Sequence, residues 1–177
     1  MAGKYVDVDP EPTKQDPIWS REAIEILNFL EDCGGATEEA IKSAFPKSFN
    51  LLYVLRKAGW VRRCFVPGLD ALWISLTTEP PTTEYEFIKQ SAVGWFAARL
   101  KAAGGSVRNT DKGLIAIFPS KAEFPLVVWD ARGGKAPLNS FALIIDSSDP
   151  PSTAVFWVYA RDLLTKPFKD CIQTAKK

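Results

Sequence analysis

Basic side chains gather in one stretch of the sequence, and they are the groups best suited to chemistry with a polyanion. Residues 40–69 contain six lysines and arginines and no aspartate or glutamate, whereas residues 19–39 contain one arginine and six acidic residues. The net charge of the whole chain is only +1, so any attraction for phosphate must come from this local cluster. The six cations are Lys42, Lys47, Arg56, Lys57, Arg62 and Arg63.

Polar side chains in the same stretch are of the types that hydrogen-bond to base edges. Asparagine pairs with adenine and arginine with guanine, which favours Asn50 and Arg56 as base contacts, with Tyr53 beside them. One surface cation alone is usually just solvated, but six of one sign in a short stretch favour contact with duplex DNA. The predicted DNA-binding residues are therefore Lys42, Lys47, Ser48, Asn50, Tyr53, Arg56, Lys57, Arg62 and Arg63.

Most enzyme classes lose support from what the sequence lacks. Histidine is absent from the chain, which removes the commonest general base and every histidine-containing triad or metal site. The phosphate-loop pattern, GxxxxGK followed by Ser or Thr, and the dinucleotide pattern GxGxxG are absent as well. The sequence therefore predicts no catalytic residue, no metal ligand and no cofactor.

Acidic residues in the second half of the chain raise one enzymatic alternative. Asp111, Asp130 and Asp146 each lie beside an apolar run, and metal-dependent nucleases hold Mg²⁺ with carboxylates on a sheet. The lysine expected two residues after such an acid is missing, because Arg132 follows Asp130 and no lysine follows Glu123 at that spacing. Aspartate also commonly starts turns at strand ends. An active nuclease is therefore disfavoured, and a degenerate nuclease-like domain stays an alternative.

Cysteines and tryptophans are predicted to be core residues. The three cysteines are far apart and form no CxxC pair, which is typical of reduced core thiols: Cys33, Cys64 and Cys171. Four of the six tryptophans fall on predicted apolar faces, for which core packing is expected: Trp19, Trp60, Trp95 and Trp129.

A polar N-terminal segment precedes the first elements that are expected to position the cations. Residues 1–18 carry six charged residues and three prolines, and this composition predicts a flexible tail. Ser20 is a good N-cap for a first helix, because its hydroxyl can accept from a free amide of the first turn. Trp19 and Ile24 have the spacing of a hydrophobic staple around that cap.

Two further helices and a hairpin are expected next. Thr37 caps a second helix, and a third runs over about residues 48–57 with Gly59 in the left-handed position that follows a helix. Two short β runs then surround the turn signal at 67–68, Pro-Gly, which predicts a hairpin.

Three helices followed by a hairpin is the order of a winged helix-turn-helix. The segment LYVLRKAGWVRR at residues 52–63 resembles the junction between recognition helix and wing in many bacterial winged-helix regulators. The resemblance covers residues 19–76 and implies that the third helix enters the major groove while the hairpin meets the backbone or minor groove. Winged helices also serve as protein-interaction modules, so a scaffold that does not bind DNA is the other reading.

The second half of the chain predicts a different architecture. Residues 77–83, TTEPPTT, are typical of a linker, and a helix over 84–103 is long enough to bridge two domains or to form a homodimer. Short apolar runs with a period of two follow, which predicts a small antiparallel sheet of four or five strands. The long helix and a second helix over about 167–175 are expected to flank that sheet. The predicted class is α+β, with a tail (1–18), a winged-helix domain (19–76), a linker (77–83) and an α+β domain (84–177).

These observations together predict a double-stranded DNA-binding protein, either a transcription regulator or a replication accessory. The combination of a winged helix, a long helix and a small α+β domain weakly resembles replication-relaxation-type accessory proteins of plasmids and conjugative mobile elements. The C-terminal domain is then expected to serve dimerisation or partner contact. No apolar stretch approaches the 20 or so residues of a membrane span, and the N-terminus lacks the apolar core of a secretory signal, which predicts a cytoplasmic protein.

Overall fold

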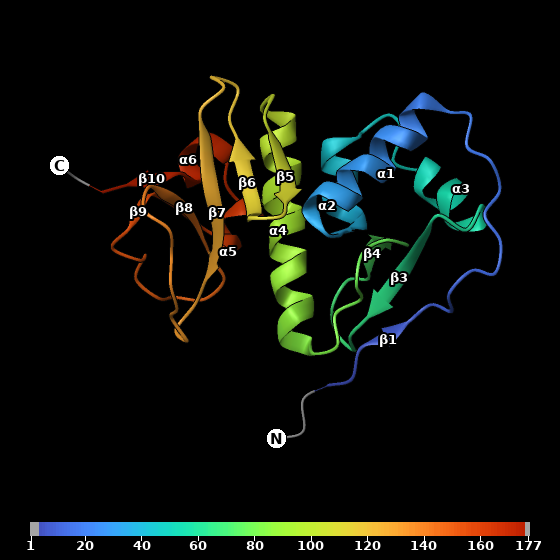
Figure 1. The fold of residues 1–177 in the computed structure, drawn as a ribbon, viewed down its shortest axis with the longest axis horizontal. Helices are drawn as coiled ribbons and strands as arrows, with labels where there is room; N and C mark the ends of the chain where they lie inside the picture. The colour runs from blue at the N-terminus through green and yellow to red at the C-terminus, as the bar shows by residue number, and fades with distance from the viewer. Residues whose placement is uncertain (1–3, 176–177) are drawn as a thin grey trace. The chain divides into compact units, whose positions relative to one another are not determined.

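The computed structural model describes residues 4–175 and divides the chain into two compact units, 1–94 and 95–177 (Figure 1). The division falls inside the long helix α4, Glu84–Ala102, rather than at the residues 77–83 that composition predicts as a linker. The first half of α4 belongs to the N-terminal unit because Phe87 is part of that unit's buried core. The described residues form mixed α and β structure, so the α+β class is correct.

The N-terminal unit combines three helices with a four-stranded antiparallel sheet. The sheet order is β1-β3-β4-β2, so the short strand between the first two helices lies at the far edge, beside β4. The hairpin expected around 67–68 is confirmed as β3 and β4, which pair from Val61 opposite Ser75 to Cys64 opposite Leu72. The elements are β1 (Asp7–Val8), α1 (Arg21–Cys33), β2 (Ala36–Thr37), α2 (Glu38–Ala44), α3 (Leu51–Lys57), β3 (Val61–Phe65) and β4 (Leu72–Ser75).

Local sequence signals explain where these helices begin. The Ser20 hydroxyl accepts from the Ala23 amide at 3.3 Å, and the Thr37 hydroxyl accepts from the Ala40 amide at the same distance, so both predicted caps are confirmed. Helix α3 begins at Leu51 rather than at 48, because residues 46–50 form turns before it. Gly59 has a φ of +82°, the left-handed conformation that its position predicts.

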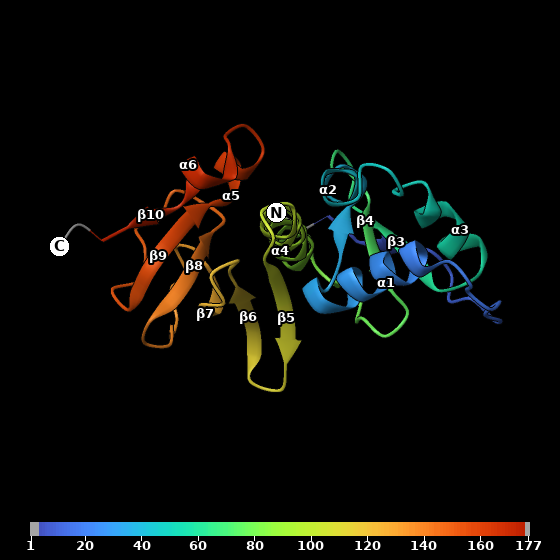
Figure 2. The ribbon, with the colours of Figure 1, turned by 90° about the horizontal axis from the view of Figure 1, so that it is seen from above.

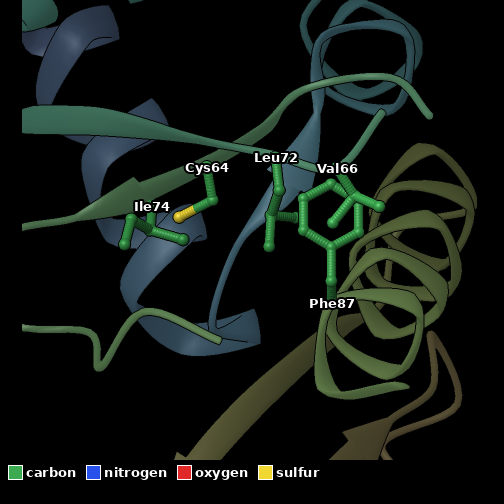
Figure 3. Packing of buried hydrophobic residues seen from close by; sticks show 5 residues of the cluster. All are labelled: Cys64, Val66, Leu72, Ile74 and Phe87. Carbon is green, nitrogen blue, oxygen red and sulfur yellow. The ribbon is translucent and has the colours of Figure 1, made fainter. Parts of the chain in front are cut away.

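A buried cluster on one face of the hairpin forms part of the N-terminal core. Phe87 of α4 packs there with four hairpin side chains, as Figure 3 shows: Cys64, Val66, Leu72 and Ile74. The opposite face of the hairpin is also covered, because Trp73 is 1% exposed and its ring meets Tyr53 of α3 edge-on, with centroids 5.3 Å apart. The hairpin is thus fixed from both sides, which is what holds its arginines in place.

The prediction of a flexible tail over residues 1–18 is wrong for the described residues of that segment, because they contact β3 and α3. Residues 4–16, here called the strap, lie along the edge of β3 and then beside α3 (Figure 1). Strand β1 pairs with β3, and the Asp16 amide donates to the Ala58 carbonyl at 2.9 Å. Composition misjudged this segment because Val6 and Val8 are apolar at a spacing of two and pack against the core cluster.

One predicted core residue is wrong. Trp19 is 89% exposed and Ile24 is 42% exposed, so the expected staple around Ser20 does not form. The fully buried tryptophan of the N-terminal unit is Trp73 instead. The other three predicted core tryptophans are partly buried: Trp60, Trp95 and Trp129.

The C-terminal unit is a six-stranded sheet with short helices against it, seen from above in Figure 2. The strand order is β10-β9-β8-β7-β6-β5, so neighbouring strands follow one another along the chain. Its elements after the end of α4 are β5 (Ser106–Thr110), β6 (Gly113–Ile117), β7 (Glu123–Trp129), β8 (Ser140–Ile144), β9 (Ala154–Tyr159), α5 (Ala160–Leu163), α6 (Phe168–Cys171) and β10 (Gln173–Thr174).

The prediction of an antiparallel C-terminal sheet is wrong, because the sheet is mixed. Strand β8 pairs parallel with both β7 and β9, while the remaining pairs are antiparallel. All five residues of β8 are buried, as expected for a strand covered on both faces, and such strands lack the alternation of a half-exposed antiparallel strand. The predicted helix over 167–175 is too long, because α6 spans only Phe168–Cys171 and β10 then joins the sheet edge beside β9.

Helix α4 is bonded to α5 by one side chain. Arg99 of α4 donates from Nε and Nη2 to the Leu163 carbonyl at 2.9 and 2.6 Å, which ties α4 to the end of α5.

No helix among the described residues is both long and apolar enough to cross a membrane.

Candidate nucleic-acid interface

The structure gathers most of the predicted DNA-binding residues on α2, α3 and the turn between them. Leu52 and Leu55 are fully buried and fix one side of α3 against the core, which turns the polar side outward. Three of the nine candidates are only partly exposed: Ser48, Arg62 and Arg63. The remaining six are exposed: Lys42, Lys47, Asn50, Tyr53, Arg56 and Lys57.

Asn50 precedes α3 at the N-cap position but does not cap it. Its backbone is already helical, with φ −65° and ψ −18°, and its side chain makes no capping hydrogen bond. An N-cap side chain typically bonds the helix amides from an extended backbone conformation. The exposed carboxamide of Asn50 is therefore not committed to the helix end.

Tyr53 is held more firmly than its exposure suggests. Its hydroxyl donates to the Glu38 carboxylate at 2.8 Å, and its ring packs edge-on against Trp73. The hydrogen bond to Glu38 is the main reason that the pKa of Tyr53 is raised above 10.0. The phenol thus links α3 to the first turn of α2 in the free protein.

Asp9, which is not among the predicted site residues, contacts two of the candidate arginines. Asp9 Oδ2 accepts from Arg56 Nε at 3.1 Å and from Arg63 Nε at 3.0 Å. It also accepts from the Arg63 backbone amide at 3.1 Å. Burial opposes ionisation of Asp9, but the hydrogen bonds from Arg63 and Arg56 outweigh it and lower the pKa below 3.8.

Arg62 and Arg63 lie on opposite faces of the hairpin. Successive side chains of a strand alternate, and the register places Arg62 opposite Ile74 of the core cluster and Arg63 opposite Trp73. The Arg63 guanidinium lies 4.9 Å from the centre of the Phe65 ring. Arg62 Nε is buried with no hydrogen-bond partner among residues 4–175. Of the two arginines, it is Arg63 that shares the Asp9 carboxylate with Arg56.

A polar pocket of about 400 Å³ opens between the strap and α3. Pro10 and Pro12 line it from the strap, Arg56 and Lys57 line it from α3, and Arg62 lines it from β3. Lys57 is exposed and makes no ion pair with any described residue. The pocket gives an anion access to this end of α3 from solvent.

The acidic residues that suggested a nuclease act as turn formers in the structure. Asp130 accepts from the Arg132 amide at 2.9 Å, and Asp146 accepts from the amides of Ala131 and Ser148 at 2.8 and 2.9 Å. The hydrogen bonds from Ser148 are the main reason that the pKa of Asp146 is lowered. Asp111 follows β5, two strands away from β7, or roughly 10 Å at ordinary strand spacing. Within residues 4–175, no three acidic, cysteine or histidine residues are grouped to hold a metal ion.

The cysteines lie in the core, as their spacing predicts. Cys33, Cys64 and Cys171 are all buried free thiols. Burial raises the pKa of Cys33 to about 12 and that of Cys64 to about 11. Both side chains are therefore neutral thiols at physiological pH and contribute packing rather than reactivity.

Comparison with known proteins adds no assignment to this geometry. No family model matches the chain, and no curated protein or solved structure matches it either. Function is therefore inferred from the residues and contacts of the chain itself.

Proposed function

We propose that residues 19–76 form a winged helix that binds double-stranded DNA, with α3 as the recognition helix and the β3–β4 hairpin as the wing. The order of elements supports this, since three helices lead into an antiparallel hairpin. The observation that carries the proposal is the exposed polar surface of α2, α3 and the turn between them, formed by Lys42, Lys47, Asn50 and Lys57. It offers phosphate-binding cations on both sides of a side chain that can pair with adenine.

Each residue of this surface has a distinct task in the proposal. Asn50 contacts a base edge, because its carboxamide is exposed and is not used as a cap. The three lysines neutralise phosphates on either side of the groove. Arg56 and Arg63 belong to the same surface through their shared contact with Asp9. Arg62 lines the pocket beside Arg56, but its Nε is buried, so no phosphate contact is assigned to it.

The biological setting proposed from the resemblance is that of a cytoplasmic transcription regulator or of a replication or mobile-element accessory protein. The C-terminal unit then provides dimerisation or partner contact, with residues 84–103 as the homodimer helix. Analytical ultracentrifugation tests the homodimer, since a monomer at micromolar concentration would contradict dimerisation through this helix. A scaffold that binds only protein is the alternative, and it predicts no affinity for duplex DNA even at low salt.

The contact roles are tested with fluorescence anisotropy on a labelled duplex. We expect the double variant K47A/K57A to weaken binding on all sequences and to reduce the salt slope by about 1.8, which is 0.9 for each lost phosphate contact. The matched control is K112A/K135A, which removes the same charge from two exposed lysines of the C-terminal unit. Equal effects from both double variants would contradict a localised interface.

The base contact has its own test. Asn50→Ala should cost about 1–3 kcal/mol on a duplex selected for tight binding and much less on a random duplex. Equal losses on both duplexes would show that Asn50 does not read sequence.

A further inference from the structure

Three N–H donors converge on one oxygen where the strap crosses the hairpin. The donors are Arg56 Nε, Arg63 Nε and the Arg63 backbone amide, and all lie 3.0–3.1 Å from Asp9 Oδ2. A fourth contact joins Arg63 Nη2 to Asp9 Oδ1 at 3.5 Å. Two guanidinium groups and a main-chain amide around one anionic oxygen are also what binds a phosphate oxygen in protein–DNA contacts.

The two arginines come from the two elements assigned to DNA, and the carboxylate comes from outside both. Arg56 lies on α3 and Arg63 on the hairpin, while Asp9 lies 47 and 54 residues earlier in the chain. The Asp9 side chain is only 16% exposed, whereas Arg56 is 42% and Arg63 27% exposed. The arginines therefore face solvent around a carboxylate that covers their inner donors.

The strap that carries Asp9 is held by few backbone contacts. Strand β1 has two residues, and beyond it the Asp9 amide donates to the Arg63 carbonyl at 2.8 Å. The next backbone bond of the strap to α3 is the one from Asp16 to Ala58. Between these two points lies the open pocket lined by Asp9, Arg56 and Lys57, so an incoming anion can reach Asp9 and Arg56 from the solvent side. Arg63 does not line the pocket, but its side chain is 27% exposed.

We propose that Arg56 and Arg63 form a phosphate-binding subsite that Asp9 occupies in the free protein and that a DNA phosphate takes over when duplex binds. This inference depends on the proposed function, since the displacing anion is a phosphodiester of the bound duplex. Asp9 then lowers the affinity for every duplex equally, because it competes for backbone contacts and not for bases. Binding thus opens the strap at Asp9 while the pairing of Asp16 with Ala58 can stay in place.

The test replaces the competing carboxylate by its uncharged isostere. Asp9→Asn keeps the shape of the side chain, and Asp7→Asn is the matched control, because it removes the same charge from an exposed strap residue that makes no ion pair with a described residue. We expect D9N to bind a random 30-mer duplex about tenfold more tightly than D7N, which corresponds to the loss of one charge-assisted hydrogen bond from the competing state.

Three results are distinguishable. Tighter binding by D9N than by D7N supports the subsite. Equal binding by both variants overturns the competition and leaves DNA binding intact. No binding by the wild type or either variant at low salt overturns the proposed function, and the subsite with it.

A second measurement does not depend on the folding of a variant. Hydrogen exchange of the wild-type protein, with and without the 30-mer duplex, follows the Asp9 amide, which bonds the Arg63 carbonyl. We expect faster exchange at Asp9 when duplex is bound, with unchanged exchange in the buried strand β8 as an internal control. Unchanged or slower exchange at Asp9 in the complex would overturn the displacement.

Discussion

Replacement of Asp9 by asparagine should also destabilise the free protein, and the size of the loss can be worked from its contacts. The carboxylate joins Arg63, which is 27% exposed, and Arg56, which is 42% exposed. We assign about 1–1.5 kcal/mol to the better buried contact with Arg63. The contact with Arg56 is screened by solvent and contributes about 0.5 kcal/mol. The expected loss of unfolding free energy is therefore about 1.5–2 kcal/mol, or a fall in Tm of roughly 3–8 °C for a chain of this size.

The pH dependence of this loss follows from the lowered pKa of Asp9. A carboxyl group whose pKa is lower in the folded state stabilises that state when it is ionised, so the contribution is complete above the ordinary value of 3.8. It is then lost as the pH falls below that value and through the folded pKa. Wild type and D9N should differ by a constant amount between pH 5 and 8, and the difference should shrink below about pH 4.

Urea denaturation at a series of pH values measures this difference, with D7N as the control for the removal of a strap charge. We expect D7N to stay within about 0.5 kcal/mol of wild type throughout, as is usual for exposed positions. A D9N protein as stable as wild type at pH 7 would refute the reasoning. So would a difference that keeps its full size at pH 3.

Two other predictions concern packing and the thiols. Gly94→Ala should lower the unfolding free energy by about 1–3 kcal/mol in thermal unfolding, because an added Cβ would overlap the Gly35 carbonyl and Ala36. A variant as stable as wild type would show that α4 can shift away. The native protein should react negligibly with a thiol reagent at pH 8, since Cys33 and Cys64 are buried with raised pKa values, and all three cysteines should react after unfolding. Rapid labelling of the native protein would contradict the assignment of the cysteines to the core.

Features set by a few neighbouring residues could be predicted from the sequence. Ser20 and Thr37 cap their helices because a hydroxyl needs only the amide three residues on. Gly59 adopts a positive φ because the chain leaves a helix there, and a Cβ would in addition overlap the Lys14 carbonyl. The two caps and the positive φ are local signals, and the distant Lys14 carbonyl only reinforces the need for glycine at 59.

Features that depend on distant partners could not be predicted in the same way. The strap is ordered by its pairing with β3 and by Asp9, and nothing near residues 7–9 in the sequence indicates either partner. The parallel pairing of β8 had a signal, since the run 141–145 does not alternate, but a covered antiparallel strand gives the same pattern. Trp19 had the spacing of a staple, yet spacing does not show whether a neighbouring element is there to cover the ring.

The candidate site likewise has features that follow from the local sequence and features that depend on distant partners. The exposure of Asn50, Lys47 and Lys57 follows from the helical period of α3 and the turn before it. The separation of Arg62 from Arg63 follows from the two-residue period of a strand, which holds for any two adjacent strand residues. The neutralisation of Arg56 and Arg63 by Asp9 could not be anticipated, because it requires the fold of the strap.

The most direct test of DNA binding is anisotropy of the wild-type protein on a labelled random 30-mer duplex, titrated at salt concentrations from 20 to 200 mM. Five cations on the proposed surface predict a plot of log affinity against log salt with a slope of about −4.5. A clear affinity at low salt that falls steeply in this way is the result we expect. No binding at 20 mM salt, or an affinity that does not change with salt, would contradict a phosphate-binding surface on α2, α3 and the hairpin.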